Sequence, residues 1–184
     1  MTTTGSTNEA RLLLLDTMAQ MEPHLEWALT GLTEQQRYYH SGTANTIAYT
    51  AWHAVRGLDG VSNRVCQGKP ELWEGKGYRA KLGFPSDMQM RRYTNDQINA
   101  MRFEPFGELI NYAKDSMRSV VDYLNKATNE DLETVIPNSR IDNANPSGSF
   151  SKLRLLRGRI THASMHSGEI YVLRGVQGLQ GGPV

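Results

Sequence analysis

Two histidines four residues apart, His162 and His166, have the residue type and the spacing to do chemistry together. Four residues turn a helix through about 400°, so two helical imidazoles at this spacing share one face and lie one turn apart. Such a pair can hold a divalent cation, although two ligands do not make a site. The best candidate for a third ligand is His53, in the middle of a second strongly helical segment. The alternative is that the pair are ordinary polar residues on a solvated helix face.

Three further side chains lie one helical turn from these histidines. Glu169, one turn beyond the pair, could orient a histidine or act as an acid or base; a surface glutamate or a dimer contact is the alternative. Tyr49 precedes His53 by one turn and could reach a cavity there, although core packing is the more common role at this spacing. Arg56 could receive an anionic group, or form an ion pair with Asp59 or a neighbour, which is the more common use. These three residues are the weak candidates for catalysis.

The charge balance of the chain excludes some classes of function. Nineteen acidic and twenty basic residues leave a formal charge of +1 over 184 residues. A nucleic-acid-binding protein would normally show a basic stripe, so we do not expect direct nucleic-acid binding. The length fits one domain, residues 1–184, which can bury a core without disulfides. The expected partner is a small-molecule substrate.

The cysteine count and the N-terminal residues indicate a cytoplasmic protein. Cys66 is the only cysteine, so it cannot form an internal disulfide, and nothing near it in the sequence supplies a base. No charged-then-apolar signal segment opens the chain. The apolar run Leu12–Leu15 is far too short to span a bilayer, so no membrane association is expected.

Four segments show apolar residues spaced by three and four, the pattern of helices that bury one face. They cover roughly residues 7–32, residues 44–67, the stretch after Pro105, and the stretch from Ser149, as a cap, to Gly175. A long loop between the second and third segments, residues 68–93, contains Gly, Pro and aromatic residues. No stretch shows convincing strand alternation. The sequence therefore predicts an all-α four-helix bundle.

Smaller signals refine these boundaries. Ser6 is a possible cap for the first helix, and Pro23 should kink it. Thr94 opens a capping box that predicts a short helix up to residue 100. Residues 130–135 could add one helical turn, and residues 138–149, rich in Asn, Ser, Pro and Gly, predict a loop.

Three blocks of sequence together resemble the DinB superfamily. They are Asn45-Thr-Ile-Ala-Tyr-Thr-Ala-Trp-His53, then Gln67-Gly-Lys-Pro-Glu-Leu-Trp-Glu74 with Gly77-Tyr78, and His162-x-x-x-His166-x-Gly-x-Ile-x-x-Leu-Arg-Gly175. The order and spacing of all three blocks carry the resemblance, which covers most of the chain from Ala44 onward. This superfamily includes thiol-dependent transferases and the maleylpyruvate isomerase of mycothiol metabolism.

The resemblance implies both a fold and a metal site. The implied fold is a four-helix bundle in a mirror variant of the up-and-down topology, usually assembled as a homodimer. The implied site holds one divalent metal ion on three histidines, and His53, His162 and His166 match those positions. Three neutral imidazoles leave an open coordination position, as catalytic metal sites do. Zinc or nickel is the expected ion, with a low-molecular-weight thiol as one candidate cosubstrate.

The expected function is that of a metal-dependent enzyme, similar to thiol S-transferases or to hydrolases, in which the ion activates a thiol or water. One alternative is a non-catalytic metal-binding module, and another is a stress-related dimeric interaction protein. We expect the 68–93 loop to form part of the pocket wall. Its residues Trp73 and Tyr78, together with Trp52, would either line the mouth or pack in the core. The sequence does not specify the substrate.

Overall fold

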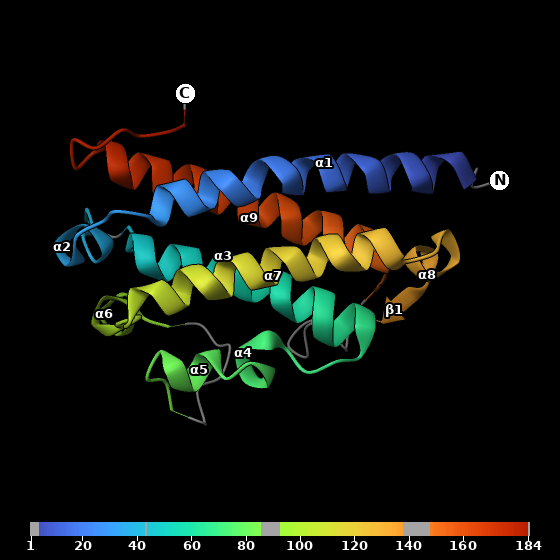
Figure 1. Ribbon diagram of the computed structural model, residues 1–184, viewed down its shortest axis with the longest axis horizontal. Coiled ribbons are helices and arrows are strands. Elements are labelled where there is room, and N and C mark those ends of the chain that lie inside the picture. Colours follow the sequence, from blue (N-terminus) through green and yellow to red (C-terminus); the bar gives the residue numbers. More distant parts are fainter. Residues whose placement is uncertain (1–3, 43, 86–92, 138–147, 184) are drawn as a thin grey trace.

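The computed structural model describes residues 4–42, 44–85, 93–137 and 148–183. The prediction of an all-α four-helix bundle is confirmed, since four long helices dominate these residues (Figure 1). They are α1 (Thr4–Leu29), α3 (Ile47–Asp59), which continues directly into the π-helix η1 (Gly60–Cys66), α7 (Phe106–Lys126) and α9 (Lys152–Gly175). None of the helices among the described residues has the length and apolar character needed to cross a bilayer.

The order of the helices around the bundle determines which residues meet. Helix α1 packs against α7 and α9, and α3 packs against the same two helices, so α1 and α3 lie on a diagonal. In Figure 1, α1 and α9 run in one direction while α3 and α7 run in the other. This is a variant of the simple up-and-down arrangement, as the resemblance implied. Because α3 and α9 are antiparallel neighbours, the middle of one lies beside the middle of the other.

Short elements connect the long helices. They are α2 (Glu34–Arg37), α4 (Leu72–Gly75), α5 (Tyr78–Lys81), α6 (Asn95–Ala100), α8 (Asn129–Glu133), β1 (Val135–Pro137) and β2 (Ser149–Ser151). The expected long loop between the second and third long helices contains α4 and α5. The capping box at Thr94 is present and begins α6, as predicted.

The fourth long helix begins later than the sequence suggested. Ser149 was the expected cap, but it lies in β2, which pairs antiparallel with β1. Ser151 caps α9 instead, because its side chain accepts a hydrogen bond from the backbone NH of Arg154. The expectation of no strand was therefore wrong for these two short elements. The predicted loop at 138–149 falls mostly on residues 138–147, which lie outside the described part.

Helix α1 also differs from its predicted boundaries. It begins at Thr4, so Ser6 lies inside the helix and is not its cap. Pro23 lies within the helix, which continues through it to Leu29. Helix α8 ends at Glu133, so the predicted turn at 130–135 is helical only in its first part.

The core fills the space between the four long helices. Its fully buried members come from every helix of the bundle, which fixes α3 against α9 through shared contacts. They include Met18, Leu25, Trp52, Leu58, Leu109, Met117, Leu124 and Ile160. A rigid core of this kind holds the facing side chains of α3 and α9 in place.

Candidate metal centre

Three histidines from two helices meet between α3 and α9. His53 comes from the middle of α3, and His162 and His166 from the middle of α9. One ring nitrogen from each residue lies within 4.8 Å of the other two. The ring centroids are 5.2 Å apart for His53 and His162, 5.0 Å for His53 and His166, and 4.3 Å for His162 and His166. All three side chains are partly buried.

A hydrogen bond from His166 to Glu169 orients the His166 ring. His166 Nδ1 lies 2.7 Å from Glu169 Oε2. The ionised carboxylate can only accept, so Nδ1 carries the proton and His166 Nε2 presents a lone pair. That Nε2 lies 3.1 Å from His162 Nε2. Of the roles considered for Glu169, its position is that of a residue that orients a histidine.

The separation of the two Nε2 atoms on α9 fits a single divalent ion. Two nitrogens bound to one zinc ion at about 2.0–2.1 Å, with angles of about 90–110°, lie about 2.8–3.4 Å apart. The 3.1 Å separation of the two Nε2 atoms falls in this range. His162 Nδ1 is buried and has no hydrogen-bond partner within the described residues. Among those residues, these three histidines are the only group of His, Cys, Asp or Glu side chains close enough to hold a metal ion.

The protonation state of the histidines also suits metal binding. Burial lowers the pKa of His53, and the neighbouring His166 lowers it further. The pKa of His162 is lowered to about 4. Burial is the largest cause, and the neighbouring His166 and His53 add to it. Both rings are therefore neutral at neutral pH, and the neutral imidazole is the form that coordinates metals.

The structure places Tyr49 and Arg56 in different surroundings. The Tyr49 ring stacks on His53, with centroids 5.9 Å apart and an interplanar angle of 13°. Tyr49 is also buried in the core, so it packs against the centre from one side. Arg56 Nη1 binds Glu71 Oε2 at 2.6 Å and Asp59 Oδ2 at 3.5 Å. These contacts lie on the side of α3 that faces α4 and α7. Of the two roles considered for Arg56, the structure therefore shows the ion pair.

The aromatic residues of the 68–93 loop pack in the core. Trp73 is buried against Trp52 and Tyr112, and the Tyr78 hydroxyl donates a 2.5 Å hydrogen bond to Asp115. These contacts direct both side chains towards α7. Of the two roles expected for Trp73 and Tyr78, the structure shows core packing. Residues 86–92 of the same loop lie outside the described part.

A cavity adjoins the histidines at Glu169, and we call it the apolar cavity. It has a volume of about 680 Å³. Its lining consists of Ala44, Asn45, Thr50, Gly168, Glu169, Val172 and Leu173. Sequence reasoning missed Thr50, although its position one turn before His53 was a signal that it shares the neighbourhood of that histidine.

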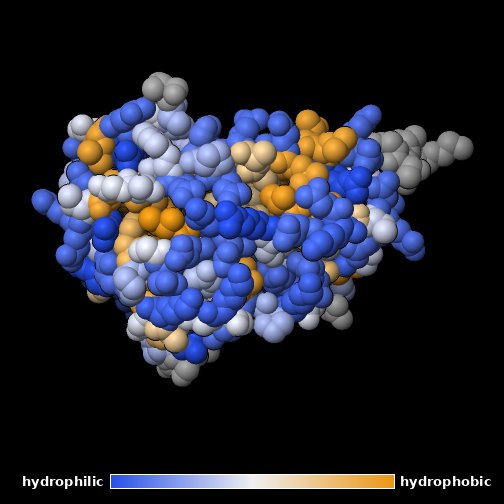
Figure 2. All heavy atoms as spheres, viewed as in Figure 1, coloured by the Kyte–Doolittle hydropathy of each residue, from blue (hydrophilic) through white to orange (hydrophobic). Residues whose placement is uncertain are grey.

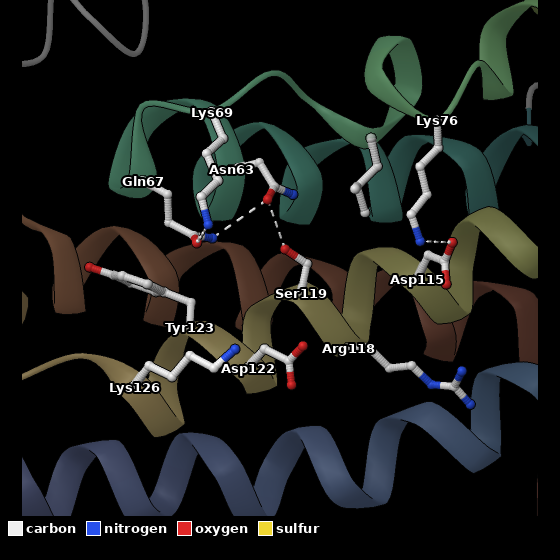
Figure 3. Close-up of a pocket in the computed structure, with 11 residues that line it drawn as sticks. Asn63, Gln67, Lys69, Lys76, Asp115, Arg118, Ser119, Asp122, Tyr123 and Lys126 are labelled. Atoms are coloured by element: carbon white, nitrogen blue, oxygen red, sulfur yellow. Dashed lines mark hydrogen bonds and ion pairs between the residues drawn. The ribbon is translucent and has the colours of Figure 1, made fainter.

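A second, polar pocket lies between η1, α4 and α7, and Figure 3 shows its lining. Its volume is about 380 Å³. The polar groups there bind one another: Ser119 Oγ donates to Asn63 Oδ1 at 2.9 Å, and Lys76 pairs with Asp115 at 2.7 Å. The lining mixes cations and carboxylates. We interpret this pocket as the polar packing between η1 and α7.

Comparison with known proteins identifies the family. The family model described as the DinB superfamily matches residues 17–170, which include all three histidines, and the chain belongs to this superfamily. The crystal structure of a conserved protein from Enterococcus faecalis has a TM-score of 0.74 and 22% sequence identity. The match covers 91% of this chain and 96% of that chain, and shows a shared fold. The search of curated proteins found no match.

Proposed function

We propose that His53, His162 and His166 bind one divalent metal ion, with zinc or nickel as the expected ion. The observation that carries this proposal is the convergence of three ring nitrogens within 4.8 Å. An all-imidazole donor set suits several first-row metals, zinc and nickel among them. Three protein ligands leave room for a further ligand, which is the arrangement of catalytic zinc sites.

The proposed activity is thiol transfer or hydrolysis on a small molecule. When bound, the ion would supply a Lewis acid that favours the ionised form of a thiol or water, or that polarises a carbonyl. Glu169 accepts a hydrogen bond from the protonated His166 Nδ1 and so keeps Nε2 free for coordination. Tyr49 packs against His53 and limits the movement of that ring. Membership of the DinB superfamily supports this assignment, with a low-molecular-weight thiol as the cosubstrate.

Metal analysis followed by turnover measurements tests the proposal. Purified protein loaded with zinc or nickel and then desalted should retain about one ion per chain. The loaded protein is then assayed with 1-chloro-2,4-dinitrobenzene plus a small thiol, and separately with a nitrophenyl ester. Metal-dependent turnover of either substrate supports an enzyme. Retention of the ion without turnover of either supports the non-catalytic metal-binding module.

We also propose that the chain forms a homodimer. Leu12 and Leu13 of α1 are 55% and 68% exposed. Figure 2 shows apolar atoms gathered over this helix on an otherwise largely hydrophilic face. A contiguous exposed apolar patch marks an interaction surface more often than scattered apolar residues do. A homodimer through α1 is compatible with either an enzyme or a non-catalytic interaction protein.

A further inference from the structure

We infer that the apolar cavity receives a neutral substrate group with an apolar body and one hydrogen-bonding oxygen, an inference that rests on the proposed metal site. The cavity and the histidines share Glu169, which lines the cavity and accepts a hydrogen bond from His166. Because α3 and α9 are antiparallel, residues before His53 face residues after His166. Thr50 and Val172 therefore line the cavity from α3 and α9, one to two helical turns from the histidines.

The shape and lining of the cavity favour an apolar group. A volume of about 680 Å³ is within the range of small-molecule sites, about 300–1,000 Å³. Val172, whose side chain is largely exposed, lies at the mouth, while Leu173 is buried. Ala44 and Gly168 contribute little or no side chain, which leaves the space open. A ligand with an aliphatic or aromatic ring system would displace water from this apolar surface, which is favourable.

Thr50 supplies the reason for a hydrogen-bonding oxygen on the ligand. It is 1% exposed, and its hydroxyl has no hydrogen-bond partner within the described residues. A threonine inside a helix commonly bonds to the carbonyl four residues earlier, so this lack is unusual. A buried hydroxyl without a partner is unfavourable. A ligand oxygen that reaches Thr50 would satisfy it.

The charge of the lining favours a neutral ligand. Among the described lining residues, Glu169 is the only one that carries a formal charge. No lysine or arginine of the described residues lines the cavity to balance an anionic group. A ligand carboxylate inside the cavity would therefore face the Glu169 carboxylate.

Three probes with one ring system test this inference on the metal-loaded protein. They are 2-naphthalenemethanol, 2-methylnaphthalene and 2-naphthoate, with binding followed by equilibrium dialysis. We expect the alcohol to bind most tightly and the carboxylate at least about tenfold more weakly. Equal or tighter binding of 2-naphthoate would overturn the assignment of a neutral ligand. Failure of both neutral probes to bind would overturn the assignment of the cavity as a binding site for a neutral ligand.

The substitution Thr50→Val removes the hydroxyl and leaves the shape of the cavity nearly unchanged, so it tests the contribution of the hydroxyl to binding. The alcohol should bind about fivefold more weakly, the effect of losing one hydrogen bond, while 2-methylnaphthalene binds at least as well as before. The melting temperature should rise, because an unpartnered buried hydroxyl is removed. Thr17→Val on α1, outside the lining, is the matched control and should change neither probe. Unchanged binding of the alcohol by Thr50→Val contradicts the role of Thr50.

Two further variants keep the test independent of folding and of metal binding. Val172→Arg at the exposed mouth should weaken binding of both neutral probes without loss of fold; unchanged binding contradicts the location. His162→Ala, which changes no lining residue, should still bind them. If the wild type retains metal but binds neither neutral probe, the cavity inference fails alone. If the probes bind but no metal is retained, the proposed metal site fails alone.

Discussion

Glu169 determines which nitrogen of His166 faces the other two histidines. Its carboxylate accepts from Nδ1 at 2.7 Å, so the tautomer with a free Nε2 is selected. Partners of this kind commonly change metal affinity by about 10–100-fold when they are removed. Glu169 thus acts on the proposed metal through His166, as a positioning residue.

Metal affinity should fall in a graded order across two variants. His162→Ala should lose most of the bound ion, because two imidazoles make a poor site. Glu169→Gln should retain the ion with about tenfold weaker affinity, since the amide is a weaker acceptor. Competition with a chromophoric chelator measures both. His24→Ala, an exposed histidine of α1 outside the three-histidine group, is the control. Full occupancy in His162→Ala contradicts the site.

The Cys66 thiol should be inert in the folded protein. Burial raises its pKa to about 12, which outweighs the opposing effect of Lys152, so the thiol stays protonated at neutral pH. Iodoacetamide should therefore label native protein slowly and urea-unfolded protein rapidly, as mass spectrometry can follow. Cys66→Ala should leave any thiol-transfer rate unchanged. Rapid labelling of the native protein would show that Cys66 is reactive.

At the scale of elements, Asp59 fixes the loop after η1 to the bundle. Its carboxylate is completely buried and accepts from the backbone NH groups of Leu72 and Trp73, at 2.8 and 2.9 Å. It also accepts from Asn63 and from the Tyr112 hydroxyl. The first two backbone NH groups of α4 are therefore bound by a residue of α3, 13 residues before Leu72.

Replacing Asp59→Ala should destabilise the fold by about 3–5 kcal/mol, because several buried donors, including the Arg56 guanidinium, lose their acceptor. Urea unfolding measures this free energy. Asp122→Ala is a suitable control, since that residue lies on the exposed side of α7, and its effect should stay within about 0.5 kcal/mol. A loss of less than about 1 kcal/mol for Asp59→Ala would show that the network contributes little.

The parts of the structure that depend on local periodicity were predictable from sequence. The four long helices follow from apolar spacing, and the shared face of His162 and His166 follows from helical geometry. The strand pair was not predictable, because three-residue strands at 135–137 and 149–151 show no alternation and form only by pairing with each other. The true cap of α9 at Ser151 depends on that pairing.

The surroundings of the site were less predictable than its histidines. Trp73 and Tyr78 resembled pocket residues because they lie in a long loop, yet the α4 cap at Asp59 directs Trp73 into the core. The spacing of Thr50 from His53 indicated only that the two residues are neighbours, since the significance of Thr50 comes from an unpartnered hydroxyl beside a cavity. Both features depend on how separate elements pack together, which local sequence patterns do not report.

For the whole molecule, stability should fall at acidic pH. Burial opposes ionisation of Glu71, Asp115 and Asp131, but ion pairs and hydrogen bonds outweigh it, so the pKa of each is lowered. A carboxylate with a lowered folded pKa stabilises the fold above its unfolded pKa, about 4, and loses this contribution as the pH falls through its folded pKa. Urea midpoints should therefore be lower at pH 3 than at pH 6. An unchanged midpoint would contradict these shifts.

The proposed homodimer should depend on the apolar residues of α1. Leu13→Glu places a charge at a position that is 68% exposed, so the monomer should still fold. We expect a dimer for the wild type and a monomer for the variant in sedimentation equilibrium. Val135→Glu, at another exposed apolar position, is the control and should remain dimeric. A wild type that is monomeric at all concentrations contradicts the proposal.

The pairing of α3 with α9 also sets an order of events during synthesis. His53 leaves the ribosome before His162, which follows roughly 110 residues later, and translation at about 5–20 residues per second makes that delay about 5–20 seconds. Throughout this interval α3 has no α9 to pack against, and its histidine has no neighbouring imidazoles. A nascent chain therefore cannot assemble the three-histidine group early, and the complete proposed site becomes available only once the residues of α9 have been synthesised.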